Sequence, residues 1–217
     1  MILGIDTSTS AIAVALGDGA TVLDRRARID ARGHSEHLAP LIAELLRDNG
    51  FAPADLSAIA VGNGPGPFTG LRVGLVTAVT MGHALGVPVH GVCSLDILAA
   101  QAGRTEGGLV VASDARRKEV YWATYAASPG QVTRLTGPSV DRPDDLPEAV
   151  RALPTVGRGP LLYPQAFPHG DADVLDVDAG TLVTVVADRL ADGEVLPVEA
   201  LYLRRPDALT TAERAAR

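Results

Sequence analysis

The sequence predicts an α/β protein of two lobes. Two stretches, one at the N-terminus and one after residue 106, open with consecutive short apolar strands. Between them, "LSAIAVG", a glycine-proline loop, an apolar helix over 71–85 and "VPVHGV" follow the strand–loop–helix–strand order of a βαβ unit. A layout that begins twice in the same way favours two related lobes, which we place at 1–105 and 106–205, followed by a C-terminal tail at 206–217.

The composition is that of a soluble globular protein. Of the 217 residues, 47% are hydrophobic and 21% are charged, and the apolar runs are too short to cross a bilayer. The net charge of −7 argues against strong binding of a nucleic-acid backbone by this chain alone. The start "MILGIDTS" lacks a basic leader and Cys93 is the single cysteine, so we expect a cytoplasmic protein with no disulfide and no membrane contact.

The first lobe is expected to open with three strands, "ILGID", "AIAVALGDG" and "ATVLDRRARI", with Gly-Asp-Gly turn chemistry between the last two. A helix over 34–49 comes next, because apolar residues such as Leu38 and Leu41 fall at helical spacing and Asn49-Gly50 supplies a left-handed stop. The glycines of "SLDILAAQAGRTEGG" then predict a hinge between the lobes.

The second lobe is expected to repeat the strand-rich opening with "LVVASDA", "EVYWATYAA" and "QVTRLTG". A weak helix over 144–152, a "TVGRGP" turn, a strand "VLDVD" and the helix "GTLVTVVADRLADG" follow. We expect the chain to fray from Thr210 onward.

Small residues recur every fourth position in the helix over 71–85, at Gly74, Ala78 and Gly82. Interior glycines cost a helix about 1 kcal/mol each, so the row needs a reason. Either this face packs tightly on its own sheet, or it meets another helix, including one from a second subunit.

The loop before that helix, "GNGPGPFTG", combines two kinds of backbone control. Pro65 and Pro67 fix φ, while the glycines permit positive φ, so we interpret the loop as a preshaped bend that leads into the helix. An anion site at the helix N-terminus is the alternative.

The duplicated layout resembles the actin, hexokinase and Hsp70 superfold, in which the first strand of each lobe leads to an acidic residue and a phosphate-binding turn. In the first lobe, Asp6, Thr7 and Ser8 either order Mg²⁺ and hold phosphate oxygens, or only satisfy turn backbone groups. In the second lobe the corresponding turn runs from Asp114 to Arg117, and Arg116 and Arg117 stand where close phosphate approach requires glycine. We therefore predict a degenerate nucleotide site that binds no cofactor.

Two histidines, His34 and His37, stand at the start of the first helix. Zinc pairs on a helix usually sit four residues apart, whereas these are three apart and no later His–Asp set completes a site. We expect capping and surface contacts and no metal. No Ser-His-Asp order in the sequence supports a catalytic triad either.

The motifs "ILGIDTSTSAIAVAL", "HSEHLAPLI", "GNGPGPFTGLRVG", "SDARRKEVYWA" and "ALYLRRP" occur in this order over nearly the whole chain. Together they resemble the TsaB family, also called YeaZ. One departure is Pro67, where the family commonly carries serine, so any role of that hydroxyl is in doubt. The resemblance implies two actin-like (ribonuclease H-like) lobes.

The resemblance also implies a function. The chain would be a non-catalytic subunit that supports TsaD in transferring the threonylcarbamoyl group to the adenosine next to the anticodon of ANN-decoding tRNAs, with the ATPase TsaE joining the complex. It would form a homodimer when alone and meet tRNA only through the complex. Rival interpretations are an ATP-dependent small-molecule kinase of the same superfold and a protease. By the same resemblance, the partner surface lies on two first-lobe helices, at His34, His37, Leu38, Leu41, Gly74, Ala78 and Gly82.

Overall fold

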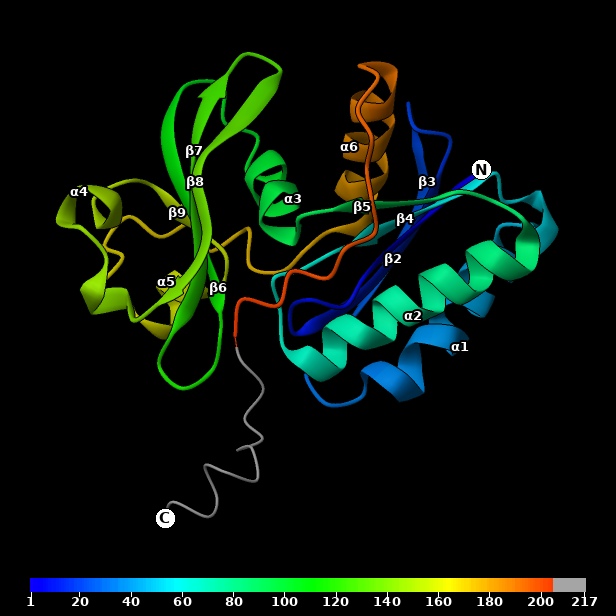
Figure 1. Cartoon of the computed structure of the whole chain (residues 1–217), viewed down its shortest axis with the longest axis horizontal. Coiled ribbons are helices and arrows are strands. Elements are labelled where there is room, and N and C mark those ends of the chain that lie inside the picture. The colour runs from blue at the N-terminus through cyan, green and yellow to red at the C-terminus, as the bar shows by residue number, and fades with distance from the viewer. Residues whose placement is uncertain (205–217) are drawn as a thin grey trace, which may run out of the picture.

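The computed structural model describes residues 1–204, which form two lobes, each built on its own sheet (Figure 1). The tail predicted at 206–217, including the segment from Thr210, lies outside the described residues. The first sheet has the order β3-β2-β1-β4-β5. Its strands are β1 (Ile2–Asp6), β2 (Ala11–Gly17), β3 (Val22–Ile29), β4 (Ala58–Gly62) and β5 (Val89–Val92).

The second sheet is a reduced copy of the first. Strands β1, β2 and β3 pair antiparallel and β4 runs parallel to β1; in the second lobe β6, β7 and β8 pair antiparallel and β9 runs parallel to β6. Its order is β8-β7-β6-β9, with β6 (Gly107–Asp114), β7 (Val120–Ser128), β8 (Gln131–Asp141) and the short β9 (Thr155–Val156). The predicted repeat of a strand-rich opening is therefore confirmed.

Helices cover both faces of the first sheet (Figure 1). On one face, α1 (His34–Asp48) and α2 (Phe68–Leu85) pack over large side chains such as Leu3, Ile5 and Val14. On the other face, α6 (Ala179–Ala191) packs over small residues such as Ala13 and Ala15. The alternation of large and small residues along β1 and β2 thus sets one wide layer and one close layer.

Two helices cross between the halves of the sequence. The segment predicted as a hinge contains α3 (Ser94–Gln101), which packs on β6, β7 and β8, while α6, from the second half, packs on the first sheet. The chain then returns along the first lobe, where the Gly91 N–H donates to Leu196 O and the Leu201 N–H donates to Asn63 O. Each sheet is therefore covered by a helix from the other side of the lobe boundary predicted at residue 105.

Two predicted elements of the second lobe differ in the structure. The helix expected over 144–152 is a 3-10 turn (Pro143–Asp145) followed by α4 (Glu148–Arg151), because Pro147 ends the first segment and starts the second. The strand expected at "VLDVD" is wrong. Arg158, at the start of α5 (Arg158–Leu162), donates to Asp176 Oδ1 at 2.8 Å, and Gln101 bonds the backbone at Asp176 and Asp178, so side chains take the place of strand neighbours.

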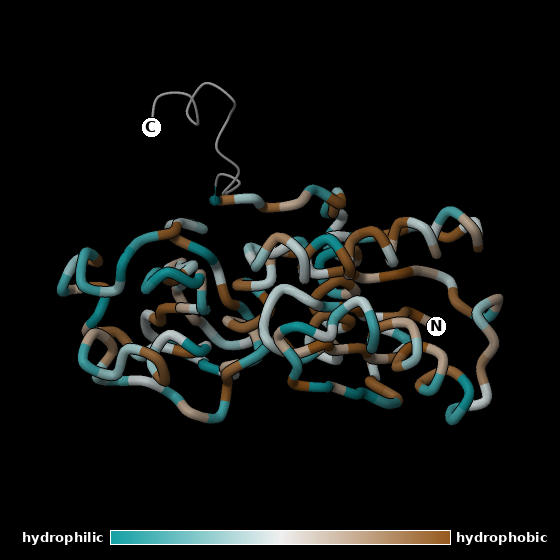
Figure 2. Tube along the Cα trace, turned by 90° about the horizontal axis from the view of Figure 1, so that it is seen from below, coloured by the Kyte–Doolittle hydropathy of each residue, from teal (hydrophilic) through white to brown (hydrophobic). Residues whose placement is uncertain are grey.

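Figure 2 shows hydrophobic segments running through the interior of both lobes and hydrophilic segments at the outer bends of the trace. Within residues 1–204, no helix has the length and the apolar content needed to span a membrane.

Candidate functional site

The turn that follows β1 directs the carboxyl group of Asp6 into the lobe. Its Oδ1 accepts hydrogen bonds from the Ser8 N–H at 2.8 Å and the Ser8 hydroxyl at 2.7 Å, and its Oδ2 accepts from the Ser94 hydroxyl at 2.7 Å. Asp6 is fully buried, and this burial raises the pKa of its carboxyl group above the ordinary value. Of the two interpretations of this turn, satisfaction of local polar groups is the one that the contacts support.

The glycine-proline loop closes over the same turn. A Cβ at Gly62 would lie 1.7 Å from Asp6 Oδ2, and one at Gly66 would lie 2.5 Å from Ser8 O. The glycines at these two positions are therefore required by close approach. Gly64 has a φ of 89°, so the positive φ that the loop glycines permit is used at this position, whereas close approach accounts for Gly62 and Gly66.

The start of α2 continues this contact. The Thr7 hydroxyl donates to Gly70 O at 2.7 Å and accepts from the Gly74 N–H at 3.0 Å. A Cβ at Gly74 would lie 2.4 Å from Thr7 Oγ1. The hydroxyl that could have held a phosphate oxygen therefore joins the turn to α2.

The second-lobe turn has a different geometry. Arg116, Arg117 and Lys118 have φ values of 62°, 53° and 63°, which form a left-handed turn of three cationic residues between β6 and β7. The Arg116 N–H donates to Asp114 Oδ1 at 2.7 Å, so this backbone donor is already used. Side chains and an internal hydrogen bond occupy the position where a phosphate cradle would need free N–H groups.

The cleft between the two turns is closed. It encloses about 10 Å³, which is room for about one water molecule, whereas small-molecule pockets enclose about 300–1,000 Å³. The residues on either side are Ser8, Thr9, Ser113, Asp114, Arg116 and Arg158. We conclude that residues 1–204 leave no space for a nucleotide between these two turns.

The residues predicted for the partner surface lie mostly inside the first lobe. Ala78 has no exposed surface, and a Cβ at Gly82 would lie 2.2 Å from Val89 Cγ2 on the neighbouring strand. The small-residue row therefore packs on its own sheet, and its prediction as a contact surface is wrong. His37 and Leu41 are partly exposed, whereas the residues buried in the lobe are His34, Leu38, Gly74, Ala78 and Gly82.

The first of the two histidines takes part in the packing of the turn. His34 is buried, with its Nε2 3.2 Å from Thr9 O, and His37 Nε2 lies 3.4 Å from Asp30 Oδ2. Among residues 1–204, no group of three or more His, Cys, Asp or Glu side chains is arranged to hold a metal ion. The contacts are those of structural histidines.

The opposite side of α2 exposes large apolar side chains. Phe68, Val76 and Val79 are 52%, 57% and 48% exposed, and the guanidinium of Arg72 lies 5.2 Å from the centre of the Phe68 ring. These four residues, which we call the α2 outer face, follow helical spacing. Sequence patterns hardly indicate this face, because α2 is apolar nearly all round and such helices are usually buried on all sides.

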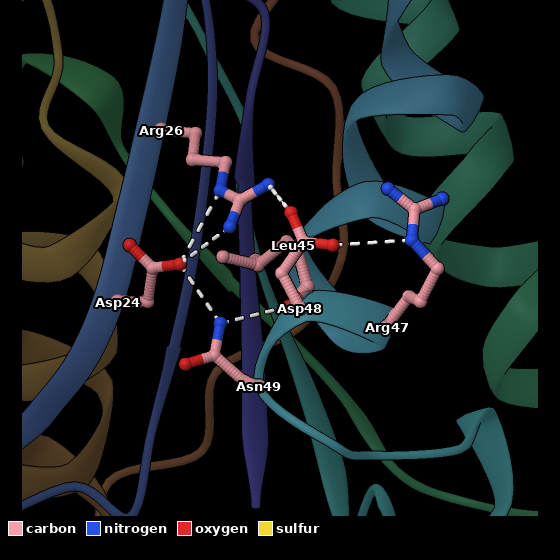
Figure 3. Close-up of polar contacts among 6 residues, drawn as sticks. All are labelled: Asp24, Arg26, Leu45, Arg47, Asp48 and Asn49. Atoms are coloured by element: carbon pink, nitrogen blue, oxygen red, sulfur yellow. Dashed lines mark hydrogen bonds and ion pairs between the residues drawn. The ribbon is translucent and has the colours of Figure 1, made fainter.

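A polar network joins the end of α1 to the edge strand β3 (Figure 3). Arg26 on β3 pairs with Asp24 and with Asp48, each at 2.9 Å. Asn49 donates to Asp24 Oδ2 and to Leu45 O, each at 2.8 Å. The Asn49 hydrogen bond, followed by Arg26, holds the pKa of Asp24 below its ordinary value, so the network binds the ionised carboxylate and links α1 to the edge strand.

Known proteins similar to this chain identify its family. The family described as "TsaD: tRNA N6-adenosine threonylcarbamoyltransferase" matches residues 27–154. The "tRNA threonylcarbamoyladenosine biosynthesis protein TsaB" of Escherichia coli is 33% identical over 94% of each chain. This chain belongs to the TsaB family.

Solved structures agree with this assignment. "YeaZ from Pseudomonas aeruginosa" has a TM-score of 0.80 at 31% identity and covers 93% of this chain and 99% of that chain. The predicted two-lobed, actin-like and ribonuclease H-like fold is thereby confirmed. An uncharacterized protein of Mycobacterium leprae is 42% identical over 96% of this chain, and the chain spans 56% of that relative's length.

Proposed function

We propose that this chain is a non-catalytic subunit in the synthesis of threonylcarbamoyladenosine on tRNA, and that it binds and supports TsaD. The observation that carries the proposal is the contrast between a closed cleft of about 10 Å³ and an exposed apolar helix face. A kinase of this superfold needs room for phosphates between these two turns, whereas a subunit needs a surface. The names of the TsaB relatives supply the pathway.

The α2 outer face and the adjoining exposed flank of α1 are the surface we assign to TsaD. Exposed apolar side chains with an arginine beside an aromatic ring are typical of the residues that dominate protein interfaces. In the absence of TsaD the same surface would form a homodimer, because an isologous contact can use one apolar patch twice. TsaE would join the TsaD-bound form, and ANN-decoding tRNAs would be the substrates of the assembly.

The direct test replaces Val79 by arginine in a system reconstituted with TsaD, TsaE and a tRNA transcript. Because Val79 is half exposed, Val79→Arg should stay folded, while a charge placed in a desolvated contact costs several kcal/mol, against about 8 kcal/mol for a micromolar complex. We expect loss of TsaD co-purification and of modified nucleoside measured by mass spectrometry. Val195→Arg is the matched control, since Val195 is exposed elsewhere on the chain. A Val79→Arg variant with full binding and modification would refute the assigned surface.

The non-catalytic part of the proposal has its own test. Calorimetry with ATP should give no magnesium-dependent micromolar binding to the isolated chain, because Asp6 is buried and Arg116 to Lys118 replace a phosphate cradle. Magnesium-dependent micromolar binding would favour the kinase interpretation. Hydrolysis of a casein-type substrate by the purified chain would favour the protease.

A further inference from the structure

A second, larger cavity lies beside the closed cleft. It encloses about 520 Å³ between the glycine-proline loop, the β6–β7 turn and the C-terminal segment. Its volume is within the range of small-molecule sites, about 300–1,000 Å³. We call it the loop cavity, and its lining includes Pro67, Phe68, Arg116, Tyr121, Tyr202 and Arg204.

One wall of the loop cavity is aromatic. The rings of Phe68 and Tyr202 are 5.2 Å apart at a tilt of 39°, and the two residues are 52% and 48% exposed. Tyr121 forms a buried part of the lining, with its hydroxyl donating to Gly66 O at 3.4 Å. Half-exposed aromatic rings beside a cavity that has arginines in its lining are the kind of platform on which nucleic-acid bases stack.

The facing wall is cationic. Arg116 and Arg117 line the loop cavity from the left-handed turn, and Lys118, the single lysine of the sequence, is the next residue of that turn. A left-handed conformation is unfavourable for residues with a β-carbon, so holding successive cations in this conformation is expensive in stability. The turn concentrates positive charge in a chain whose net charge is −7.

The charges of this wall differ in availability. Arg204 donates to Ala115 O at 2.8 Å and pairs with Glu119, so it fixes the C-terminal segment to the turn. Arg116 pairs with Asp114 at 3.1 Å, but its side chain is 52% exposed. The Arg116 side chain can therefore turn to a phosphate, while Asp114 keeps the Arg116 N–H as a hydrogen-bond donor.

We propose that the loop cavity binds single-stranded RNA, with a base against Tyr202 and the adjoining phosphate against Arg116 and Arg117, which both line the cavity. This inference rests on the proposed function, which makes RNA the substrate. An apolar protein segment would leave the cationic wall desolvated, and an acidic one would leave the ring faces unused, whereas a nucleotide unit matches both walls. The contact is small, which agrees with a chain too acidic to hold RNA strongly by itself.

Nuclear magnetic resonance on the isotope-labelled full chain tests the site without TsaD. A short unstructured RNA oligonucleotide at low salt should shift amide signals of 115–118, Tyr121 and Tyr202. The logarithm of its affinity should fall with the logarithm of salt concentration, with a slope of about 0.7 for one phosphate. Adenosine monophosphate, tested alone, should shift them less. Equal shifts with adenosine monophosphate would mean that the cavity binds a free nucleotide and not RNA, which would overturn the proposal. The absence of any shift of these signals at saturating RNA would also refute it.

A charge-matched pair of variants isolates the cationic wall. Arg116→Gln with Arg117→Gln should lower RNA affinity about tenfold and remove most of the salt slope. Arg25→Gln with Arg28→Gln removes the same charge from strand β3, where Arg25 likewise pairs with an aspartate. This control should leave the RNA affinity and its salt slope nearly unchanged. Equal losses in the two double variants would mean that only net charge matters, and would overturn the site.

The aromatic wall separates RNA from a protein partner. Tyr202→Leu keeps apolar surface but removes the stacking face, so RNA affinity should fall about fivefold or more, and Tyr202→Trp should restore it. If instead Tyr202→Leu weakens TsaD binding and leaves RNA affinity unchanged, the loop cavity is part of a protein contact and the inference fails. Because Val79→Arg tests TsaD binding separately, failure of one proposal is distinguishable from failure of the other.

Discussion

The two faces of α2 differ in side-chain size and in what surrounds them. On the inner face, Gly74 and Ala78 are buried against the first lobe. On the outer face, Val76 and Val79, which alternate with them along the chain, are about half exposed. In a helix that is apolar all round, the small residues therefore mark the face that approaches its own lobe most closely, and the larger ones mark the face left for a partner.

The substitution with the largest expected effect is Ala78→Arg, which tests whether the inner face of α2 is buried. The Ala78 side chain has no exposed surface, and an unpaired buried charge costs about 3–5 kcal/mol of the roughly 5–15 kcal/mol that stabilise a domain. We expect a much lower melting temperature or an unfolded chain by circular dichroism. Val79→Arg, one residue away, should melt like the wild type. A folded Ala78→Arg variant with wild-type melting would mean that α2 is rotated from its described position.

A smaller effect is expected where α2 meets the first turn. In Gly74→Ala the new Cβ would lie 2.4 Å from Thr7 Oγ1, and such overpacking costs about 1–3 kcal/mol. The same change in a Thr7→Ala background should be neutral or stabilising, because the clash is gone and alanine is better than glycine in a helix by about 1 kcal/mol.

Urea unfolding of the four proteins in this cycle gives the coupling energy between the two positions. We expect at least about 0.5 kcal/mol, with Thr7→Ala relieving the cost of Gly74→Ala. Additive effects would show that the Thr7 hydroxyl does not fix the distance between the turn and α2.

The buried carboxyl group beside this contact predicts a pH dependence. Burial raises the pKa of folded Asp6 above its ordinary value of 3.8, so between these two pKa values the folded chain binds more protons than the unfolded chain. This contribution to the free energy of unfolding is therefore present at low pH and is lost as pH rises through the folded pKa. Asp6→Asn should remove that contribution, while Ser8 can still donate to the amide oxygen.

The measurement is the difference in urea unfolding free energy between wild type and Asp6→Asn from about pH 4 to about pH 8. Wild type should lose stability relative to the variant as pH rises. At the low-pH end, where both side chains are neutral, the two should differ by about 1 kcal/mol or less. A difference that does not change with pH, or one of opposite sign, would mean that Asp6 stays ionised in the folded chain at low pH.

Much of the fold can be predicted from local sequence signals. The three opening strands, α1 and α2 have strong periodicity or turn chemistry, and the structure has each of them. Periodicity does not reveal α3, because Ser94 to Ala99 are all buried and the helix has no polar face. Its packing on the second sheet, like that of α6 on the first, is a long-range contact that local patterns do not encode.

The site is harder to predict for a related reason. The spacing of small residues is visible in the sequence, but spacing alone does not say whether a close neighbour comes from the same lobe or from another chain. Gly62, Gly66, Gly70 and Gly74 recur every fourth residue, and all four face the turn at 6–8. That regularity is the available signal that the loop and helix belong against this turn.

The smallest expected effect sharpens the meaning of the outer face. Val76 is 57% exposed, so its side chain stabilises the isolated chain little, while valine is a poorer helix former than alanine by up to about 0.7 kcal/mol. Val76→Ala should therefore raise the unfolding free energy by a few tenths of a kcal/mol while weakening association with TsaD or with a second copy. Denaturant unfolding at low protein concentration measures the first effect, and sedimentation at tens of micromolar measures the second. If Val76→Ala destabilises the chain at low concentration, the valine already packs within its own lobe, and the division of α2 into a structural and a binding face would fail at this residue.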